Sequence, residues 1–294
     1  MAKRKGIILA GGAGTRLYPL TLTISKQLLP VFDKPMVYYP LCTLMLAEIT
    51  QILIITTKED APLFRRLLGN GEQWGMQLSY AVQRRPAGIA EALIIAEPFL
   101  DGAPSALILG DNIFYGDGIR ELLVKTNQLS TGATVLAYWV KDPERYGVVQ
   151  FDANGVPVRV VEKPKDFVSN WAITGLYFFD AQAVTLAKRI SPSARGELEI
   201  TAVNEQYLNR KMLNVVRLGR GYAWLDAGTH EALLASSQFV HAIESRQGLK
   251  IACPEEIAFR NGFIDRGQLL FLAKQFEKTD YGAYLVRQAE SDMA

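Results

Sequence analysis

The sequence predicts an α/β fold in which a mostly parallel open sheet carries helices on both faces. Two observations predict it. Short apolar runs alternate with longer amphipathic runs through the first half of the 294 residues, which is the pattern of βαβ crossovers. The residues are 49% hydrophobic and 21% charged, so the chain can bury a sizeable core and does not belong to the disordered class.

The first half supplies most of the strands and helices of the expected sheet. Apolar runs predict strands at residues 5–10, 51–56, 77–82, 105–109 and 133–140. Between these runs, apolar residues recur three or four positions apart, as they do on the buried face of a helix. The helices predicted in this way are residues 36–49, 61–68, 89–96 and 119–129.

The pattern changes in the second half. Apolar runs on either side of an Asn154-Gly155 pair predict a β-hairpin with strands at residues 148–151 and 156–161. A further strand is expected at 172–179, and helices at 180–190, 200–208 and 229–247. No low-complexity linker is visible. We therefore expect one α/β domain over residues 1–250 and a helical C-terminal extension over residues 251–294.

Composition excludes several classes of protein. Lys plus Arg is 32 and Asp plus Glu is 30, a net charge of +2, which favours neither nucleic acid nor an anionic membrane as a partner. Two distant cysteines, Cys42 and Cys253, make no disulfide framework and are expected to be buried free thiols. Two histidines exclude a histidine-rich metal site. No apolar run is long enough for a signal peptide or a membrane span, so a cytoplasmic location is expected.

A glycine-rich turn follows the first strand, with the sequence Leu9-Ala10-Gly11-Gly12-Ala13-Gly14-Thr15-Arg16-Leu17. Glycines let backbone N–H groups approach a phosphate, and open α/β sheets bind ligands at this end of their strands. A dinucleotide fingerprint would need Gly or Ala at position 17, and a Walker A loop would need Gly-Lys-Ser/Thr. A plain tight turn and a phosphate-binding loop both remain open, with Arg16 and Lys26 as candidate cations.

The loop and the blocks that follow it resemble the sugar-1-phosphate nucleotidylyltransferases. The first block continues through Pro19-Leu20-Thr21 to Ser25-Lys26-Gln27-Leu28-Leu29-Pro30, a form similar to that of the glucose-1-phosphate thymidylyltransferases. Ordered blocks carry the resemblance to about residue 260. They are residues 33–36, 109–112, 142–149, 162–164, 174–178, 195–201 and 221–226.

The sequence departs from the family between residues 83 and 91. The family usually has Gln-Pro-x-Pro-x-Gly-Leu-Ala-Gln, whereas this chain has Gln83-Arg84-Arg85-Pro86-Ala87-Gly88-Ile89-Ala90-Glu91. Gln83 and Gly88 are retained. The Gln83 amide could accept from thymine N3–H and donate to O4, but the flipped amide would suit cytosine, so Gln83 alone does not choose the base. Uracil lacks only a methyl group, so discrimination against UTP should be roughly tenfold or less.

The resemblance implies a reaction. An oxygen of a hexose 1-phosphate attacks the α-phosphorus of a nucleoside triphosphate in line, giving a nucleotide sugar and pyrophosphate. For the thymidylyltransferase branch the substrates are dTTP and α-D-glucose 1-phosphate, and dTDP-glucose leads on to dTDP-L-rhamnose. Positioning and charge neutralisation, with Mg²⁺ as cofactor, suffice for such chemistry. A related enzyme with another triphosphate or hexose, an inactive nucleotide-sugar sensor, and a nicotinamide dehydrogenase are the alternatives.

The resemblance also implies residue roles, and it places the sugar-binding part within about residues 140–228. Catalytic roles fall on Arg16, Lys26 and Lys163. Asp111 and Asp226, which alone would be taken for strand-end caps or turn formers, are implied as Mg²⁺ ligands. The nucleotide set is Leu9, Gly11, Gly12, Gly14, Thr15, Arg16, Lys26, Gln83 and Gly88. The sugar-phosphate set is Asn112, Gly147, Glu162, Lys163, Ile173 and Arg195.

One implied pair needs a particular backbone. In a regular strand, Glu162 and Lys163 would face opposite sides of the sheet. Both can serve one ligand only if the strand ends or bends there, and Pro164 favours an ending because it restricts Lys163 and removes a ladder donor. An exposed Glu-Lys pair is the alternative.

The C-terminal extension resembles the regulatory part of the family. There, a second nucleotide site between subunits of a homotetramer binds the end product dTDP-rhamnose, which inhibits. The resemblance implies this allosteric role for Gly116, Arg220, Cys253, Glu256 and Arg260. Arg120 stands where the family often has His, which makes this site a variant of the family's.

Overall fold

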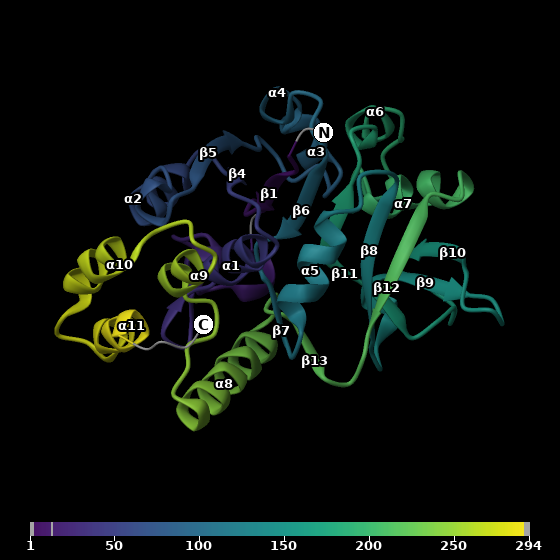
Figure 1. Cartoon of the computed structure of the whole chain (residues 1–294). Coiled ribbons are helices and arrows are strands. Elements are labelled where there is room, and N and C mark those ends of the chain that lie inside the picture. The colour runs from purple at the N-terminus through teal and green to yellow at the C-terminus, as the bar shows by residue number, and fades with distance from the viewer. Residues whose placement is uncertain (1–2, 13, 291–294) are drawn as a thin grey trace.

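A computed structural model describes residues 3–12 and 14–290 (Figure 1). The sheet that organises it has nine strands among these residues, in the order β10-β9-β11-β6-β1-β4-β5, with β8 and β12 joined through the other edge of β11. The expected mostly parallel α/β fold is confirmed, with β11 as an antiparallel strand inside the sheet. Ala13 of the glycine loop and residues 291–294 of the expected extension lie outside the described residues.

Two parallel groups flank β11. The first contains β1 (Lys5–Leu9), β4 (Gln51–Thr56), β5 (Gln77–Val82) and β6 (Ser105–Leu109). The second contains β8 (Ala133–Trp139) and β12 (Leu213–Leu218). Between them, β11 (Trp171–Phe179) runs antiparallel to both β6 and β8, and its register with β8 shifts between Ile173 and Tyr177.

Three short antiparallel pairs complete the strands. The predicted hairpin is β9 (Gly147–Phe151) and β10 (Pro157–Glu162), and its turn places Gly155 at φ +79°. Two further pairs stand apart from the large sheet: β7 (Asn112–Gly116) with β13 (Tyr222–Asp226), and β2 (Pro30–Val31) with β3 (Lys34–Pro35).

Helices cover both faces of the sheet, as expected. Side chains alternate along β1, so that Ile8 packs against one helix layer and Ile7 against the other. The first layer has α1 (Tyr38–Leu46), α2 (Ala61–Leu68), α5 (Ile119–Asn127) and α9 (Pro254–Arg260). The second layer has α3 (Glu91–Ile95), α4 (Glu97–Leu100), α6 (Ala183–Ala187) and α7 (Ile200–Asn209).

Single helical turns occur at η1 (Thr15–Leu17), η2 (Lys26–Leu28), η3 (Glu72–Trp74), η4 (Pro143–Arg145) and η5 (Lys274–Phe276).

The 36–49 helix is shorter than predicted, because the N–H groups of Met36 and Val37 donate to the carbonyls of Leu29 and Gln27. The 180–190 helix is also shorter, because the Asp180 carboxylate accepts from four groups, two of them on Gln182 in the turn before α6. β7, β12 and β13 were not predicted as strands.

The C-terminal extension is helical, as predicted, and lies against the first helix layer. It follows α8 (His230–Gln247), which Thr229 caps and Gly248 ends, and it contains α9, α10 (Arg266–Ala273) and α11 (Asp280–Glu290). Figure 1 shows α10 and α11 beside α9 at one end of the molecule. The Trp74 indole N–H donates to Glu255 at 3.1 Å, and the Asn261 amide donates to the Met45 carbonyl. These contacts fix the extension to α1 and η3.

Two smaller expectations can be compared with the described residues. Cys42 and Cys253 are buried free thiols, as predicted. None of the helices in the described part of the chain has the length and apolar character needed to cross a membrane.

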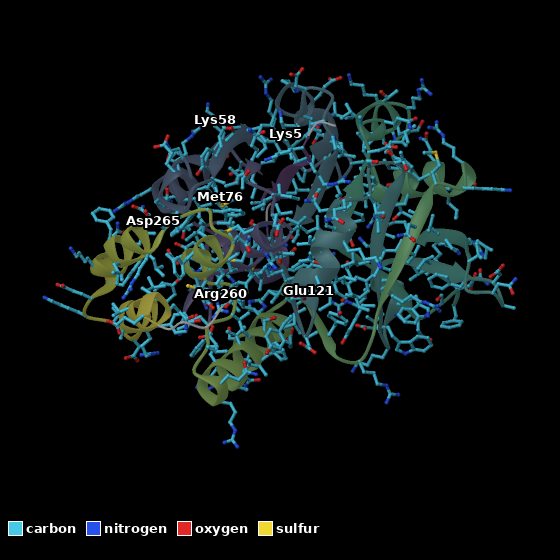
Figure 2. All side chains as sticks on the ribbon, viewed as in Figure 1. Lys5, Lys58, Met76, Glu121, Arg260 and Asp265 are labelled. Carbon is cyan, nitrogen blue, oxygen red and sulfur yellow. The ribbon has the colours of Figure 1, made fainter. Side chains whose placement is uncertain are left out.

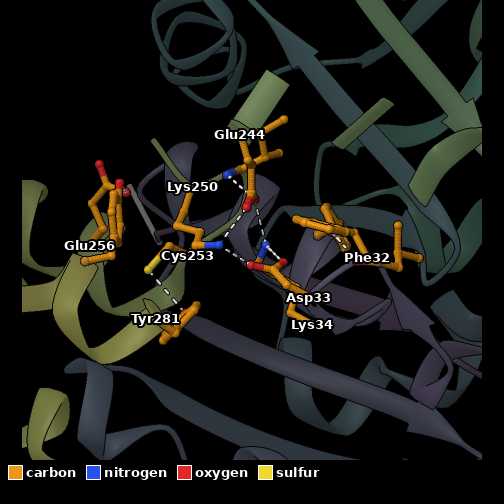
Figure 3. Close-up of polar contacts among 12 residues, drawn as sticks. Phe32, Asp33, Lys34, Glu244, Lys250, Cys253, Glu256 and Tyr281 are labelled. Atoms are coloured by element: carbon orange, nitrogen blue, oxygen red, sulfur yellow. Dashed lines mark hydrogen bonds and ion pairs between the residues drawn. The ribbon is translucent and has the colours of Figure 1, made fainter. Parts of the chain in front are cut away.

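A buried ion cluster joins the extension to the N-terminal part of the chain (Figure 3). Lys34 contacts Asp33 and Glu244, the latter at 2.9 Å, and Lys250 contacts Asp33 and, at 2.8 Å, Glu244. The Glu244 carboxylate also accepts from the N–H of Ile251 at 2.9 Å. The side chains of Lys34 and Glu244 are only 2% and 4% exposed, so each charge depends on the others for compensation.

We expect Glu244→Gln to lower the free energy of unfolding by about 3 kcal/mol, because two buried ammonium groups would share a single carboxylate. Urea denaturation measures the change. Glu231→Gln, on the exposed first turn of the same helix, is the control and should lose less than about 1 kcal/mol. Equal losses in the two variants would show that the cluster does not anchor the extension.

Candidate active site

A cavity of about 320 Å³ opens at the carboxyl ends of β1 and β6, between the parallel strands and the hairpin. Its wall includes the turn before η1, the residues after β6, the end of β10, the irregular part of β11 and the end of β13. Eleven residues implied by the sequence line it. They are Gly14, Thr15, Arg16, Lys26, Asp111, Asn112, Gly147, Glu162, Lys163, Ile173 and Asp226.

Strand pairing brings the two aspartates together. Asp226 lies opposite Asn112 in the β7–β13 pair, and the N–H of Ala227 donates to the Asp111 carbonyl at 3.0 Å. A β-carbon added to Gly228 would lie 3.1 Å from Asp226 Oδ1 and 3.7 Å from Asp111 Oδ2. The two carboxylates therefore face the same small volume, although 115 positions separate them in the sequence.

Lys26 compensates part of this charge. Its ammonium group forms an ion pair and hydrogen bond with Asp111. Burial opposes ionisation of Asp111, but the Lys26 ammonium holds the pKa of that carboxyl below its usual range. Burial, together with the negative charge of Asp111, raises the pKa of Asp226 to about 6. The pair thus retains an excess of negative charge that a cation can neutralise.

The chemistry of this pair suits a hard divalent cation that takes its remaining ligands from a substrate. Carboxylate oxygens are such ligands, and Mg²⁺ commonly binds through one or two of them together with phosphate oxygens. Within residues 3–12 and 14–290, no group of three or more His, Cys, Asp or Glu side chains could hold a metal ion. The described residues therefore do not form a site that surrounds a metal ion with protein ligands alone. Asp111 and Asp226 are the pair of carboxylates that suits a cation bound together with a substrate.

Asn112 holds this arrangement in place. Its amide oxygen accepts from the Trp224 indole N–H at 2.6 Å and from the Gly175 N–H at 3.0 Å, and its NH₂ donates to Asp111 Oδ1 at 3.1 Å. Gly175 has no room for a side chain, since a β-carbon there would lie 2.5 Å from the Asn112 oxygen. Asn112 lines the cavity, but the hydrogen bonds of its amide orient Asp111 and Trp224. A contact between Asn112 and a hexose stays a prediction.

The second strand of the hairpin ends at the position where Pro164 favoured an ending. β10 stops at Glu162, and Lys163 adopts φ +41° while its N–H donates to the Tyr146 carbonyl at 3.0 Å. This left-handed residue turns the chain, so Glu162 and Lys163 both line the cavity. Glu162 accepts from the Thr201 hydroxyl at 2.5 Å, and Gly147 packs so closely that a β-carbon would lie 2.8 Å from that hydroxyl oxygen.

Arg195 lies at the edge of the site rather than in its lining. Its guanidinium is 3.2 Å from Glu162, 2.7 Å from Glu199 and 3.8 Å from Glu197, and its side chain is 40% exposed. In this arrangement Arg195 braces Glu162. A direct contact between Arg195 and a sugar phosphate stays a prediction.

Two of the remaining nucleotide residues line a second hollow, of about 720 Å³. Gly12 and Gln83 line it, together with Lys58, Arg84 and Arg85. Leu9 and Gly11, at the end of β1, and Gly88 line neither hollow among the described residues. Gly88 has φ +107°, and a β-carbon on it would lie 2.4 Å from the Leu198 carbonyl oxygen, so this position requires glycine.

Sequence reasoning did not select several polar or aromatic residues of the cavity lining, among them Arg145, Tyr146, Tyr177 and Thr201. All four lie inside blocks that carry the resemblance, so the blocks were a signal for them. Trp224 both lines the cavity and belongs to the main core. Its ring centroid lies 5.1 Å from that of Tyr146.

A third pocket, of about 380 Å³, lies between α1, β7 and α9. Four of the five residues implied for regulation line it, namely Gly116, Cys253, Glu256 and Arg260. Arg260, marked on α9 in Figure 2, pairs with Glu256 at 2.8 Å, and Lys250 of the buried ion cluster also lines the pocket. Arg220 is exposed on the turn between β12 and β13 and is not part of this lining.

Comparisons with known proteins agree with this geometry. Residues 5–243 match the model of the nucleotidyl transferase family. A glucose-1-phosphate thymidylyltransferase of Xanthomonas campestris is 54% identical over 290 residues, which are 99% of this chain and 98% of the relative. One from Mycolicibacterium smegmatis is 55% identical over 283 residues, 96% of this chain and 98% of the relative.

Two solved structures share the fold. A Bacillus anthracis protein assigned as a glucose-1-phosphate thymidylyltransferase, in complex with a sucrose, has a TM-score of 0.73 and 42% identity. The match covers 80% of this chain and 94% of that one. A UDP-glucose pyrophosphorylase complexed with UDP-glucose has a TM-score of 0.70 at 23% identity, covering 84% and 100% of the two chains. At that identity the second match supports the fold alone.

Proposed function

The chain belongs to the nucleotidyl transferase family, and from that premise we propose that it transfers a thymidylyl group from dTTP to α-D-glucose 1-phosphate. The products are dTDP-glucose and pyrophosphate. The observation that carries the proposal is one cavity in which Asp111 and Asp226 face each other while Arg16, Lys26 and Lys163 surround them. Relatives that carry this activity in their names and match nearly the whole chain support the same choice of substrates.

Phosphoryl chemistry of this kind requires two anions to meet. In the proposed reaction, Arg16, Lys26 and the backbone around Gly14 hold the triphosphate, and Lys163 holds the attacking sugar phosphate. Glu162, fixed by Thr201 and Arg195, and the backbone at Gly147 and Ile173 bind the hexose. No side-chain nucleophile is needed, because the sugar phosphate oxygen attacks and pyrophosphate leaves.

Asp111 and Asp226 are the residues that would hold Mg²⁺. The fit rests on their convergence beside Gly228 and on the excess negative charge of the pair. Bound there, Mg²⁺ would neutralise charge on the substrate phosphates. Lys26 stabilises Asp111 in its charged form, and Asn112 keeps the Asp111 carboxylate oriented toward the cavity.

The wider setting is part of the proposal. We place dTDP-glucose formation at the first step toward dTDP-L-rhamnose, in the cytoplasm, in a homotetramer whose third pocket receives the end product as an inhibitor. The position of Gly116, Cys253, Glu256 and Arg260 around one pocket beside the C-terminal extension supports the regulatory part.

The direct test is a pyrophosphate-release assay with Mg²⁺ and glucose 1-phosphate. We expect turnover with dTTP, slower turnover with UTP by about tenfold or less, and loss of turnover in EDTA. Preference for another triphosphate or hexose would make the chain a different member of the family. Absence of turnover with binding retained would make it a nucleotide-sugar sensor.

Replacing a proposed metal ligand should impair catalysis. Asp226→Asn keeps the shape of the side chain and removes one ligand charge, so kcat/KM should fall by about 10²-fold or more. Asp111→Asn should have a similar effect. Steady-state kinetics over a range of Mg²⁺ concentrations measures this, and full activity of Asp226→Asn at limiting Mg²⁺ would contradict the pairing.

Lys163 tests the division of roles between subsites. Lys163→Ala should slow the reaction by roughly 10²–10³, because a charge-assisted contact is lost from a partly desolvated site. The loss should appear as a higher KM for glucose 1-phosphate and a lower kcat. Lys163→Arg should restore activity only in part, since its planar fork cannot replace a point charge.

Binding of dTTP alone serves as the control for Lys163. Calorimetric titration of dTTP into Lys163→Ala should give nearly the wild-type affinity, because Arg16, Lys26 and the glycine loop hold the triphosphate. Collapse of dTTP affinity with normal glucose 1-phosphate kinetics would assign Lys163 to the nucleotide subsite.

Arg260 tests the third pocket. Arg260→Ala removes a cation that could contact the diphosphate of dTDP-rhamnose, so the concentration needed for half-inhibition should rise by about tenfold. Arg266→Ala, an exposed arginine on α10, is the matched control and should leave inhibition unchanged. Equal inhibition of the Arg260 variant and the wild type would remove the regulatory assignment.

A further inference from the structure

We propose that Glu91 determines which base the enzyme accepts, by fixing the orientation of the Gln83 side-chain amide. In this role Glu91 is a positioning residue, and it stands where the family usually has Gln. The inference rests on the proposed function, because it takes Gln83 to face the base of the nucleotide. It adds to that function a physical reason for choosing thymine over cytosine.

A glutamine amide is by itself ambiguous. Its oxygen accepts hydrogen bonds and its NH₂ group donates them, and rotation by half a turn exchanges the two at little cost. One orientation matches the N3–H and O4 of thymine or uracil. The other matches the N3 and N4–H₂ of cytosine. A neighbour that only accepts hydrogen bonds removes this ambiguity in the present chain.

Glu91 is such a neighbour. The Gln83 NH₂ donates to Glu91 Oε2 at 2.7 Å. An ionised carboxylate only accepts, so the flipped amide would set its own oxygen against the carboxylate oxygen. Gln83 is 6% exposed, which leaves little access for water to relieve that repulsion. The amide is therefore held with its nitrogen toward Glu91.

The opposite end of the amide points to the glycine loop. Gln83 Oε1 lies 2.7 Å from the position that a β-carbon on Gly11 would occupy. Gly11 belongs to the loop assigned to the nucleotide, and Gly12 and Gln83 line the same hollow. The group presented to the nucleotide side is thus the acceptor oxygen.

Both partners are fixed by the backbone. The Gln83 N–H donates to the Thr56 carbonyl at 2.8 Å, which attaches it to the end of β4. Glu91 opens α3, and the segment before it is held by two bonds to Leu198: the Leu198 N–H donates to Ala87 at 2.7 Å, and the Ala90 N–H donates to Leu198 at 3.0 Å. Neither side chain can move away by a shift of its loop without breaking these bonds.

The consequence is a filter that distinguishes pyrimidines by the proton on N3. Thymine and uracil carry N3–H and can donate to the fixed oxygen. Cytosine has a lone pair at N3, which would face the lone pairs of Oε1. A site built to pair with a particular polar group rejects a base that leaves it unpaired far more strongly than it rejects one missing a methyl group. The filter therefore acts against dCTP and is indifferent to UTP.

The test is Glu91→Gln, which keeps the size of the side chain. Its amide can accept from or donate to Gln83, so either orientation of Gln83 becomes possible. Calorimetric titration with dTTP, UTP and dCTP, each with Mg²⁺, gives the affinity ratios without a sugar substrate. In the variant, the preference for dTTP over dCTP should fall by about tenfold or more, while the ratio of dTTP to UTP should stay as in the wild type.

Two controls accompany this measurement. Glu97→Gln removes an exposed carboxylate of α4 that pairs with Lys188, and it should change neither ratio. Thermal melting shows whether Glu91→Gln is folded, and Glu91→Ala, which also frees the amide, should shift the dCTP ratio in the same direction.

The outcomes separate the two proposals. An unchanged dTTP-to-dCTP ratio in folded Glu91→Gln and Glu91→Ala would overturn the role of Glu91. Loss of discrimination against UTP as well would assign Glu91 to general nucleotide binding and would also overturn it. Absence of turnover of dTTP with glucose 1-phosphate by the wild type, with the binding ratios as expected, would contradict the proposed function and leave the base filter standing.

Discussion

Two buried carboxylates with one charge-compensating lysine are the constraint around which the site is built. Burial disfavours the charge of Asp226, and Asp111 and Asp226 repel each other, which is why the pKa of Asp226 rises to about 6. The fold holds them there through the β7–β13 pairing, the Ala227 bond to Asp111 and the contact of Lys26 with Asp111. Such an arrangement is unfavourable for the empty protein and becomes favourable when a cation binds.

Several features of the fold follow from this requirement. Gly175 and Gly228 leave space beside Asn112 and the two carboxylates, where a side chain would collide or fill the gap. The irregular part of β11, between Ile173 and Tyr177, lines the cavity together with the ends of the parallel strands and of the hairpin. Lys163 leaves the hairpin in a left-handed conformation, which delivers a third cation to the cavity that Lys26 and Arg16 also line. The site contributes carboxylates and cations in fixed positions rather than a reactive side chain.

The sequence predicted the parts of the fold that depend on local patterns. The strands at 51–56, 77–82 and 105–109 and the helix at 61–68 have the predicted bounds, because buried strands and amphipathic helices carry their own periodicity. β12 and the β7–β13 pair were missed because they exist through pairing with segments far along the chain. The start of α1 depends on bonds from Met36 and Val37 to residues 27–29, which no local signal reveals.

The residues of the candidate site could likewise be predicted only in part from the sequence. Ordered motifs were sufficient to name most of the residues that line the cavity, since several of these motifs lie at or beside strand ends that reach it. They could not show that the Asn112 amide already holds Asp111 and Trp224, that Arg195 pairs with Glu162 and Glu199, or that Gln83 donates to Glu91. These are contacts between side chains, whose partners depend on the folded arrangement of several elements.

The most direct test of the central claim is the position of the metal. Anomalous diffraction from Mn²⁺, in crystals grown with a non-hydrolysable dTTP analogue and glucose 1-phosphate, locates the ion without reference to activity. We expect an anomalous peak within ligand distance of both Asp111 and Asp226 and of the phosphate oxygens. An ion bound elsewhere, with Lys26 still paired to Asp111 and Asp226 making no metal contact, would contradict the account of the site.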